Sequence, residues 1–294
     1  MIAAARGLAA ALLACVALGA HARPVAATDD AGNRVELARP AQRIASLAPH
    51  LTEQLFAIGV GDRIVGTTDF ADYPDEAKRI PRVARAHSVD LERVAALAPD
   101  LIAAWGSGYP PAVIEALRRL GAPVFVSEPR SLADIASSLE RLGALTASTG
   151  AGAVASAFRA RLDALRARYA DRRPVTVFYQ VWAQPLMTLS GKHVLNEAIR
   201  VCGGRNVFER LAPIAPHVSV EAVLAADPEV IVTAETGGRA TGALDSWKRW
   251  PALRAVRAGR LVTLDADRIN RHTPRLLDEL AVLCERLDEA RSPR

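Results

Sequence analysis

The sequence lacks the short motifs of nucleotide-binding and hydrolytic enzymes. Its 294 residues contain no GxGxxG turn after a strand, no phosphate loop of the form GxxxxGKS or GxxxxGKT, no GxSxG and no HExxH. It also has no basic block with interleaved aromatic residues, because the arginines behind its net charge of +5 are scattered along the chain. We therefore expect neither an enzyme nor a nucleic-acid-binding protein.

No apolar run is long enough to cross a membrane. The run near the N-terminus is about 13 residues long, whereas a spanning helix needs roughly 20. It follows a positively charged start and precedes Ala20-His21-Ala22, whose small residues suit a signal peptidase. We expect residues 1–22 to be a signal peptide that is cleaved after Ala22. Lipidation of Cys15 is the alternative, since LLAC loosely resembles a lipoprotein cleavage box.

Cysteine is rare, with three in the whole chain, and Cys15 would leave with the signal peptide. Cys202 and Cys284 remain, and two thiols in an oxidising compartment usually pair. Their bond would close a loop of about 80 residues and contribute on the order of 4 kcal/mol to stability. The alternative is two unpaired buried thiols. Two cysteines without a histidine at metal-ligand spacing make a poor zinc site, so no metal site is expected.

Short β-branched apolar runs alternate with amphipathic segments in both halves of the chain. This alternation indicates parallel sheets that are covered by helices on both faces. The predicted strands include 43–48, 62–68, 100–105 and 123–128 in the first half, and 174–181, 229–234 and 260–266 in the second.

Between the two halves, about 23 residues keep helical spacing without a break until Pro174. We therefore expect an α/β protein of two Rossmann-like lobes that are joined by one long helix. The expected parts are a lead-in at 23–42, a first lobe at 43–146, a linking helix at 147–172 and a second lobe at 173–290.

One helix-strand unit occurs twice. VDLERVAALAPDLIAAW begins at Val89, and VSVEAVLAADPEVIVTA begins at Val218, 129 residues later. The two copies align without a gap and share an acid, Glu92 in the first and Glu221 in the second, as well as a Pro before an Asp or Glu. Two lobes of one design would explain the repeat, although chance similarity of two ordinary units is the alternative.

Candidate binding residues follow the predicted strands. Ligands bind at the carboxyl ends of strands in doubly wound sheets, and aromatic residues there suit a flat or partly apolar ligand. These aromatic residues are Phe70, Tyr73, Trp105 and Trp182, and the histidines in similar places are His50, His87, His217 and His272. The histidines have no ligand spacing, and solvent-exposed loop histidines are the alternative interpretation.

From about Arg43 to Leu287 the chain resembles periplasmic substrate-binding proteins of the cobalamin, siderophore and haem class, and within it the cobalamin branch. The stretches that carry the resemblance include RIASLAPHLTEQLFAIGV, DLERVAALAPDLIAAW, LSGKHVLNEAIRVCGGRNVF and TPRLLDELAVLC. The resemblance implies a periplasmic, monomeric, non-enzymatic receptor without a cofactor. It would bind cobalamin or a related corrinoid between its lobes and deliver it to a homodimeric ABC permease with its ATPase subunits.

The resemblance also assigns roles to particular residues. Glu92 and Glu221 would dock on the two permease subunits, and Cys202 and Cys284 would form the disulfide of the family. The implied ligand contacts are Phe70, Trp105, Trp182 and the loop of Asp267, Arg268, Ile269, Asn270 and Arg271, with His50 and His217 beside them.

Two positions depart from the family. Ala86 and Ala215 stand where its cleft carries two further tryptophans, although His87 and His217 are next to them. A receptor for another metal chelate, such as haem, a ferric siderophore or a metal–histidine complex, is therefore the alternative function. Less compatible alternatives are an exported enzyme that uses His50 or His272 as a base and a structural envelope protein.

Overall fold

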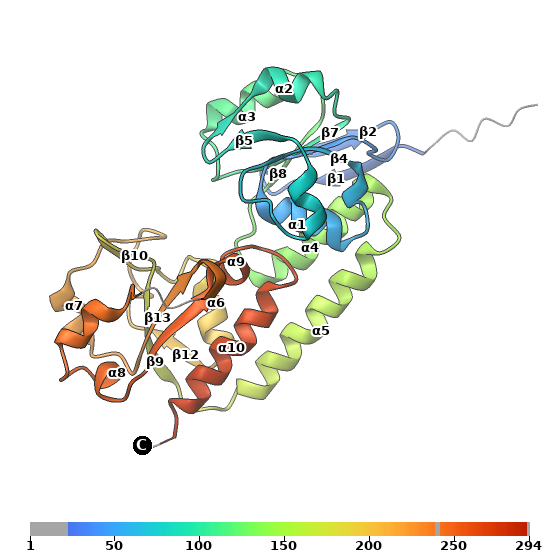
Figure 1. Cartoon of the computed structure of the whole chain (residues 1–294). Coiled ribbons are helices and arrows are strands. Elements are labelled where there is room, and N and C mark those ends of the chain that lie inside the picture. The colour runs from blue at the N-terminus through green and yellow to red at the C-terminus, as the bar shows by residue number, and fades with distance from the viewer. Residues whose placement is uncertain (1–22, 239–241, 293–294) are drawn as a thin grey trace, which may run out of the picture.

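The computed structural model describes residues 23–238 and 242–292, which form two α/β lobes joined by one long helix (Figure 1). The first lobe opens with a hairpin of β1 (Val25–Thr28) and β2 (Arg34–Leu37). Its other strands are β3 (Ile44–Ser46), β4 (Ile64–Thr68), β5 (Arg82–Arg85), β6 (Ser88–Val89), β7 (Leu101–Trp105) and β8 (Val124–Ser127). Its helices are α1 (Pro49–Ala57), α2 (Leu91–Ala96), α3 (Pro111–Arg118) and α4 (Leu132–Thr146), with short 3-10 turns η1 (Gly61–Arg63) and η2 (Asp75–Arg79).

The sheet of the first lobe has the strand order β6-β5-β4-β3-β7-β8. Every neighbouring pair is parallel except β5 with β6. In β7, Leu101 and Ala103 belong to one hydrophobic cluster while Ile102 and Ala104 belong to another, so apolar side chains cover both faces of the strand. Burial on both faces is what a parallel sheet requires, and the prediction of a covered parallel sheet is confirmed.

The second lobe repeats this architecture with fewer strands. Its strands are β9 (Val175–Gln180), β10 (Trp182–Ala183), β11 (Leu186–Met187), β12 (Gly204–Asn206), β13 (Val230–Glu235) and β14 (Leu261–Asp265). Its helices are α6 (Val194–Val201), α7 (Val220–Ala226), α8 (Arg254–Arg257), α9 (Ala266–Ile269) and α10 (Leu276–Glu289), with turns η3 (Thr236–Gly238) and η4 (Asp245–Arg249). The main sheet, β12-β9-β13-β14, is parallel throughout, while β10 and β11 form a separate hairpin.

Helix α5 (Ala151–Tyr169) joins the lobes and runs beside α4 and α10 (Figure 1). Helix α5 lies so close to α4 that a Cβ on Gly143 of α4 would be 2.2 Å from the Cβ of Ala151 of α5. Arg166 of α5 binds Glu197 of α6 at 2.7 Å, and the other oxygen of Glu197 accepts the backbone N–H of Leu132 at 2.8 Å. The two lobes are therefore tied together by packing and hydrogen bonds as well as by the chain itself.

Cys202, just after α6, forms a disulfide with Cys284 of α10 across a sequence separation of 82 residues. This confirms the pairing that the sequence predicted. Within the described ranges no helix is long and apolar enough to cross a membrane. The predicted signal peptide and Cys15 lie outside the described residues.

Candidate functional site

Most exposed large hydrophobic side chains of the described residues lie at the carboxyl ends of the two sheets. Phe70 and Tyr73 follow β4 in the first lobe. In the second lobe, Val181 and Ile214 lie in loops after β9 and β12, and Trp182 lies in the β10-β11 hairpin that follows β9. The exception is Val282 on α10. Clustered exposed apolar groups mark binding surfaces more often than scattered ones do, and strand ends are where α/β folds bind ligands. These loops therefore define the candidate site.

Phe70 has the most unusual environment of this group. The residue is 68% exposed, and its backbone has a φ of 63°, in the left-handed region that residues with a Cβ seldom adopt. Neither feature stabilises the fold, since the first leaves a large apolar ring in water and the second strains the backbone. A ring that is presented in this way is suited to cover a ligand.

Trp182 takes the corresponding place in the second lobe. The residue is 61% exposed, and its indole is oriented by a hydrogen bond from Nε1 to the carbonyl oxygen of Gln184 at 2.8 Å, within the β10-β11 hairpin. The hairpin is in turn held by a bridge between Met187 and His217. Beside Trp182 lies a cavity of about 380 Å³, lined also by Thr233 and other residues at the ends of β9 and β13. The hairpin thus presents a fixed aromatic face at the edge of a hollow.

Polar contacts between the lobes meet at Arg271, in the loop between α9 and α10. Its guanidinium donates to Glu53 of α1 at 2.7 Å, to Asp72 after β4 at 2.8 Å, and to Asp267 of its own lobe at 2.8 Å. Only 9% of Arg271 is exposed. The loop that the sequence assigned to ligand contact therefore also fixes one lobe against the other.

Arg275 extends this interlobe cluster. Its guanidinium lies 3.6 Å from the centre of the Tyr73 ring, which is a cation–π contact between the lobes. Its Nε lies 3.2 Å from Glu53, but the geometry is not that of a hydrogen bond, so we treat the pair as a contact between charges. Burial raises the pKa of Glu53, while the hydrogen bond from Arg271 and the charges of both arginines oppose that rise.

A smaller and more enclosed cavity, of about 230 Å³, adjoins the first, and we call it the inner cavity. Trp105 of the first lobe lines it, together with Tyr179, His193, His272 and other residues of the second lobe. The hydrogen bond from Gln54 Nε2 to the carbonyl oxygen of His272, 2.6 Å long, joins the lobes beside it. The two cavities share Gln180, Val181 and Ala234, so they are neighbouring parts of one cleft.

The histidines fall into two groups. His50 is 4% exposed, and its ring packs edge-on against Trp105 and His272, with centroid distances of 5.6 Å to each. Burial lowers the pKa of His50 well below its usual value and lowers that of His272 to about 4, so both are neutral at pH 7. His87 and His217 are exposed. His50 thus supports Trp105 from inside and is poorly placed to act as an accessible base.

The predicted contact loop splits in the same way. Ile269 is 1% exposed and packs in the core although it also lines the inner cavity, whereas Arg268 and Asn270 are exposed. Ala86 is exposed and Ala215 is partly exposed, so neither is a core position. Among the described residues no group of three or more His, Cys, Asp or Glu side chains could hold a metal ion.

The repeated unit forms matching structure in the two lobes. Asp90 caps α2 by accepting the N–H of Arg93, and Ser219, at the equivalent position, caps α7 by accepting that of Ala222. Glu92 and Glu221 therefore occupy the same position in the first turn of each helix, and both are exposed. Figure 1 shows α2 and α7 at the outer ends of the two lobes, away from α5.

The repeat extends to the corner that follows each helix. Ala98 has a φ of 43° and Asp227 a φ of 41°, so in both copies of the unit the backbone is in the left-handed region where it leaves the helix. The acid that ends the first corner, Asp100, accepts the N–H groups of Gln42 and Arg43 before β3.

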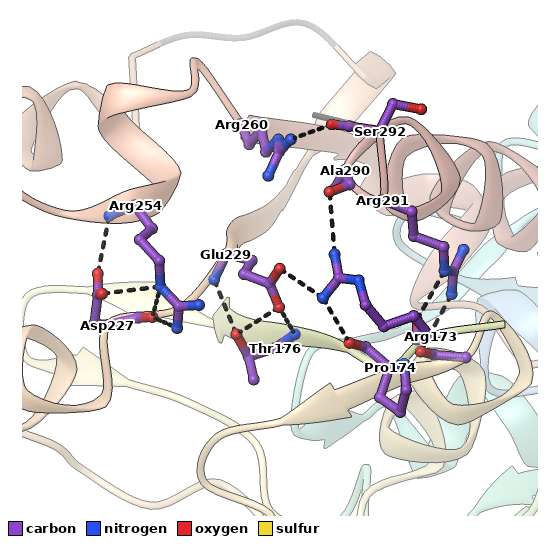
Figure 2. Close-up of polar contacts among 11 residues, drawn as sticks. Arg173, Pro174, Thr176, Asp227, Glu229, Arg254, Arg260, Ala290, Arg291 and Ser292 are labelled. Atoms are coloured by element: carbon purple, nitrogen blue, oxygen red, sulfur yellow. Dashed lines mark hydrogen bonds and ion pairs between the residues drawn. The ribbon is translucent and has the colours of Figure 1, made fainter. Parts of the chain in front are cut away.

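Glu229, the acid of the second corner, likewise accepts a backbone N–H from a neighbouring strand, here β9, which pairs with β13. Glu229 accepts the N–H of Thr176 at 3.0 Å and binds Arg173 at 2.9 Å, as Figure 2 shows. Corresponding caps, bends and acid anchors at one spacing support two lobes of one design over chance similarity.

Several site residues escaped the sequence analysis. Glu53 and Gln54 could have been found, because with Thr52 they form a polar run inside the short predicted helix; in the structure they are 3% and 0% exposed. Asp72, Arg275, Tyr179 and His193 had no such signal, since their roles depend on contacts between distant segments.

Residues 44–268 match the family described as periplasmic binding protein. The vitamin B12-binding protein of Vibrio cholerae is 40% identical over 247 residues, which are 83% of this chain and 88% of that protein. The crystal structure of the periplasmic vitamin B12 binding protein BtuF of Vibrio cholerae is similar at a TM-score of 0.79 and 38% identity, over 86% of this chain and 99% of that one. A periplasmic haem-binding protein from Pseudomonas aeruginosa is similar at a TM-score of 0.72 and 27% identity, over 83% of this chain and 91% of that one.

Proposed function

The chain belongs to the periplasmic binding protein family, and from this we propose that it binds a corrinoid between its lobes and delivers it to an ABC importer. The observation that carries the proposal is the pair of exposed aromatic residues, Phe70 and Trp182, one on each lobe at the carboxyl ends of the sheets. A flat macrocycle presents two apolar faces, which two such rings can cover. The similarity to vitamin B12-binding proteins supports the same ligand class.

We assign different tasks to the predicted contact residues. Phe70, Trp105 and Trp182 cover the macrocycle, and the exposed Arg268, Asn270 and His217 meet its polar periphery. Asp267 is partly exposed and can accept hydrogen bonds from the ligand while it holds Arg271. Arg271, Ile269 and His50 are buried and act by positioning these groups.

The charge of the interlobe cluster disfavours an anionic chelate. Three carboxylates, those of Glu53, Asp72 and Asp267, surround two guanidiniums, so no cationic group of this cluster is left for the propionates of haem or for an acidic siderophore. Arg275 also covers the ring of Tyr73, a phenol that could otherwise approach a ferric ion. A corrinoid ringed by amides does not need such a counter-charge.

We further propose that Glu92 and Glu221 dock on the two subunits of a homodimeric permease that works with its ATPase subunits. A symmetric partner presents one basic pocket twice, and the repeat places one exposed acid at the same position of α2 and α7. Two charge-assisted contacts at the outer ends of the lobes set the orientation and assist the encounter. The receptor would act as a monomer, without a cofactor and without catalysis.

Export completes this proposal. Residues 1–22 have the composition of a signal peptide, and cleavage after Ala22 would release a periplasmic protein that begins at Arg23. The disulfide between Cys202 and Cys284 suits an oxidising compartment. Lipidation at Cys15 is the competing form, and mass spectrometry of the exported protein separates the two.

Calorimetric titration of the purified protein with cyanocobalamin, and separately with haem, tests the ligand class. We expect one molecule of cyanocobalamin per chain and much weaker binding of haem. Binding of haem without binding of cyanocobalamin would contradict the proposal and would favour the metal-chelate alternative.

A further inference from the structure

The inner cavity carries a few polar groups in a mostly apolar lining near the ends of three strands. It lies where β7, β9 and β13 end, and its polar lining comes from Trp105, Tyr179, His193 and Asn270, among others. Its volume of about 230 Å³ is below the 300–1,000 Å³ typical of pockets that enclose a whole ligand. It can therefore hold a side group of a ligand but not a macrocycle.

Two buried polar atoms of this lining have no hydrogen-bond partner among the described residues. They are the hydroxyl of Tyr179, a residue that is 3% exposed, and the indole Nε1 of Trp105. Buried polar groups are nearly always paired in folded proteins, and leaving one unpaired is unfavourable. Because Trp105 and Tyr179 both line this interlobe cavity, a ligand atom that enters it is the candidate partner for their unpaired groups.

These polar groups can all supply hydrogen-bond donors. The Trp105 indole can only donate. His193 accepts the backbone N–H of Leu195 at Nδ1, 3.1 Å away, so the neutral ring carries its proton on Nε2 and offers a second donor. Burial raises the pKa of Tyr179, so its hydroxyl stays protonated and can donate as well as accept. One acceptor in the cavity would therefore satisfy all three groups.

The cavity is also uncharged. None of the residues that line it is Asp, Glu, Lys or Arg. Burial lowers the pKa values of His193 and His272, so neither ring carries a charge at pH 7. The neighbouring Arg271 is already bound by three carboxylates. An ionised group that entered would lose its water without meeting an opposite charge, which is unfavourable.

We propose that this cavity is a subsite for one neutral amide side group of the ligand whose ring lies in the outer cleft, and that it selects an amide over a carboxylate. Tyr179 and Trp105 donate to the carbonyl oxygen of that amide, and Asn270 can accept from its N–H. This inference rests on the proposed function, because it supposes a macrocycle with amide substituents.

Tyr179→Phe tests the subsite, because it removes only the hydroxyl. We expect the affinity for cyanocobalamin to fall between about fivefold and a hundredfold, since a buried carbonyl loses a donor. The thermal stability of the free protein should stay the same or rise, because the hydroxyl has no partner among the described residues. An unchanged affinity in a variant that folds normally would overturn the inference.

The matched control is Tyr109→Phe. Tyr109 is also buried, at 6% exposed, but its hydroxyl donates to the carbonyl oxygen of Leu47 at 2.7 Å and does not line this cavity. Its loss should lower the melting temperature and leave the affinity for cyanocobalamin unchanged. The two tyrosines thus predict opposite patterns of stability and affinity.

Derivatives of cyanocobalamin in which one peripheral amide has been hydrolysed to a carboxylate test the selectivity. We expect one positional isomer to bind at least about tenfold more weakly than cyanocobalamin, and Tyr179→Phe to have no further effect on that isomer. Equal binding of all isomers would overturn the subsite alone. Failure of the unmodified protein to bind cyanocobalamin would instead overturn the proposed function on which the subsite rests.

Discussion

Arg271 of the second lobe donates a hydrogen bond to Glu53 of the first at 2.7 Å, and the two side chains are only 10% and 2% exposed. They are 218 residues apart in the chain. A buried ion pair of this kind is costly to form but more costly to break, because removing one partner leaves the other charge buried. The pair thus fixes the geometry of the cleft between the lobes.

Glu53→Ala should destabilise the protein strongly. We expect the free energy of unfolding to fall by about 3 kcal/mol, the lower end for a broken buried pair, because Asp72 and Asp267 still contact Arg271. Urea denaturation measures this loss. Glu36→Ala is the control, since Glu36 pairs with Arg34 on the surface and its loss should have little effect. A loss below 1 kcal/mol for Glu53→Ala would refute a structural role for the pair.

His272 should make the protein sensitive to acid. Its pKa is about 4 in the folded protein, mainly because of burial, and about 6.5 when unfolded. The neutral ring therefore stabilises the fold fully above pH 6.5, and this contribution is lost as the pH falls from 6.5 towards 4. The difference is at most about 3 kcal/mol, and less where solvent reaches the ring.

Thermal unfolding between pH 4 and 7.5 measures this effect. His272→Asn should flatten the decline of stability below pH 6.5, although His50 and His193, whose pKa values burial also lowers, retain contributions of the same sign. His217→Asn changes an exposed histidine and should leave the profile as it is. Parallel profiles for the unmodified protein and His272→Asn would show that His272 is not the group responsible.

Replacing the paired acids should separate delivery from binding. Glu92→Gln and Glu221→Gln should each lower the rate of ligand uptake several-fold, and the double variant by more than roughly tenfold, because two charge-assisted contacts with the permease are lost. The affinity for cyanocobalamin should not change, since both residues lie in the first turns of α2 and α7, away from the cleft. Uptake by vesicles that contain the permease measures the effect.

Glu285→Gln is the control for docking, because Glu285 is exposed on α10. Normal uptake in the double variant of Glu92 and Glu221 would exclude the docking proposal and leave the ligand proposal intact.

Much of the fold could be predicted because it depends on local patterns. Continuous buried runs such as those of β7, β9 and β13 are visible as apolar stretches, and the linking helix as unbroken helical spacing. The two-residue strands β10 and β11 were not predicted, because so short a hairpin has no periodicity. Its position follows from hydrogen bonds with distant loops.

The candidate site was only half predictable from the sequence. Exposed residues such as Phe70 and Trp182 follow strands, so their positions could be inferred from the strand ends. The buried partners could not, because Arg271 meets Glu53 and Asp72 only when two lobes come together. His50 was expected in a loop at the cleft with the other histidines. It lies instead in the first turn of α1, with its ring packed against Trp105.

The most direct test of the central claim is calorimetric titration of cyanocobalamin into the unmodified protein and into a variant with Phe70→Ala and Trp182→Ala. Each ring should contribute about a thirtyfold change in affinity, as buried aromatic contacts do at interfaces. The melting temperature should stay unchanged, because the two residues are 68% and 61% exposed. We predict tight one-to-one binding by the unmodified protein and a loss of more than about a hundredfold in the variant. Equal affinities in the two proteins would contradict a corrinoid held between these rings.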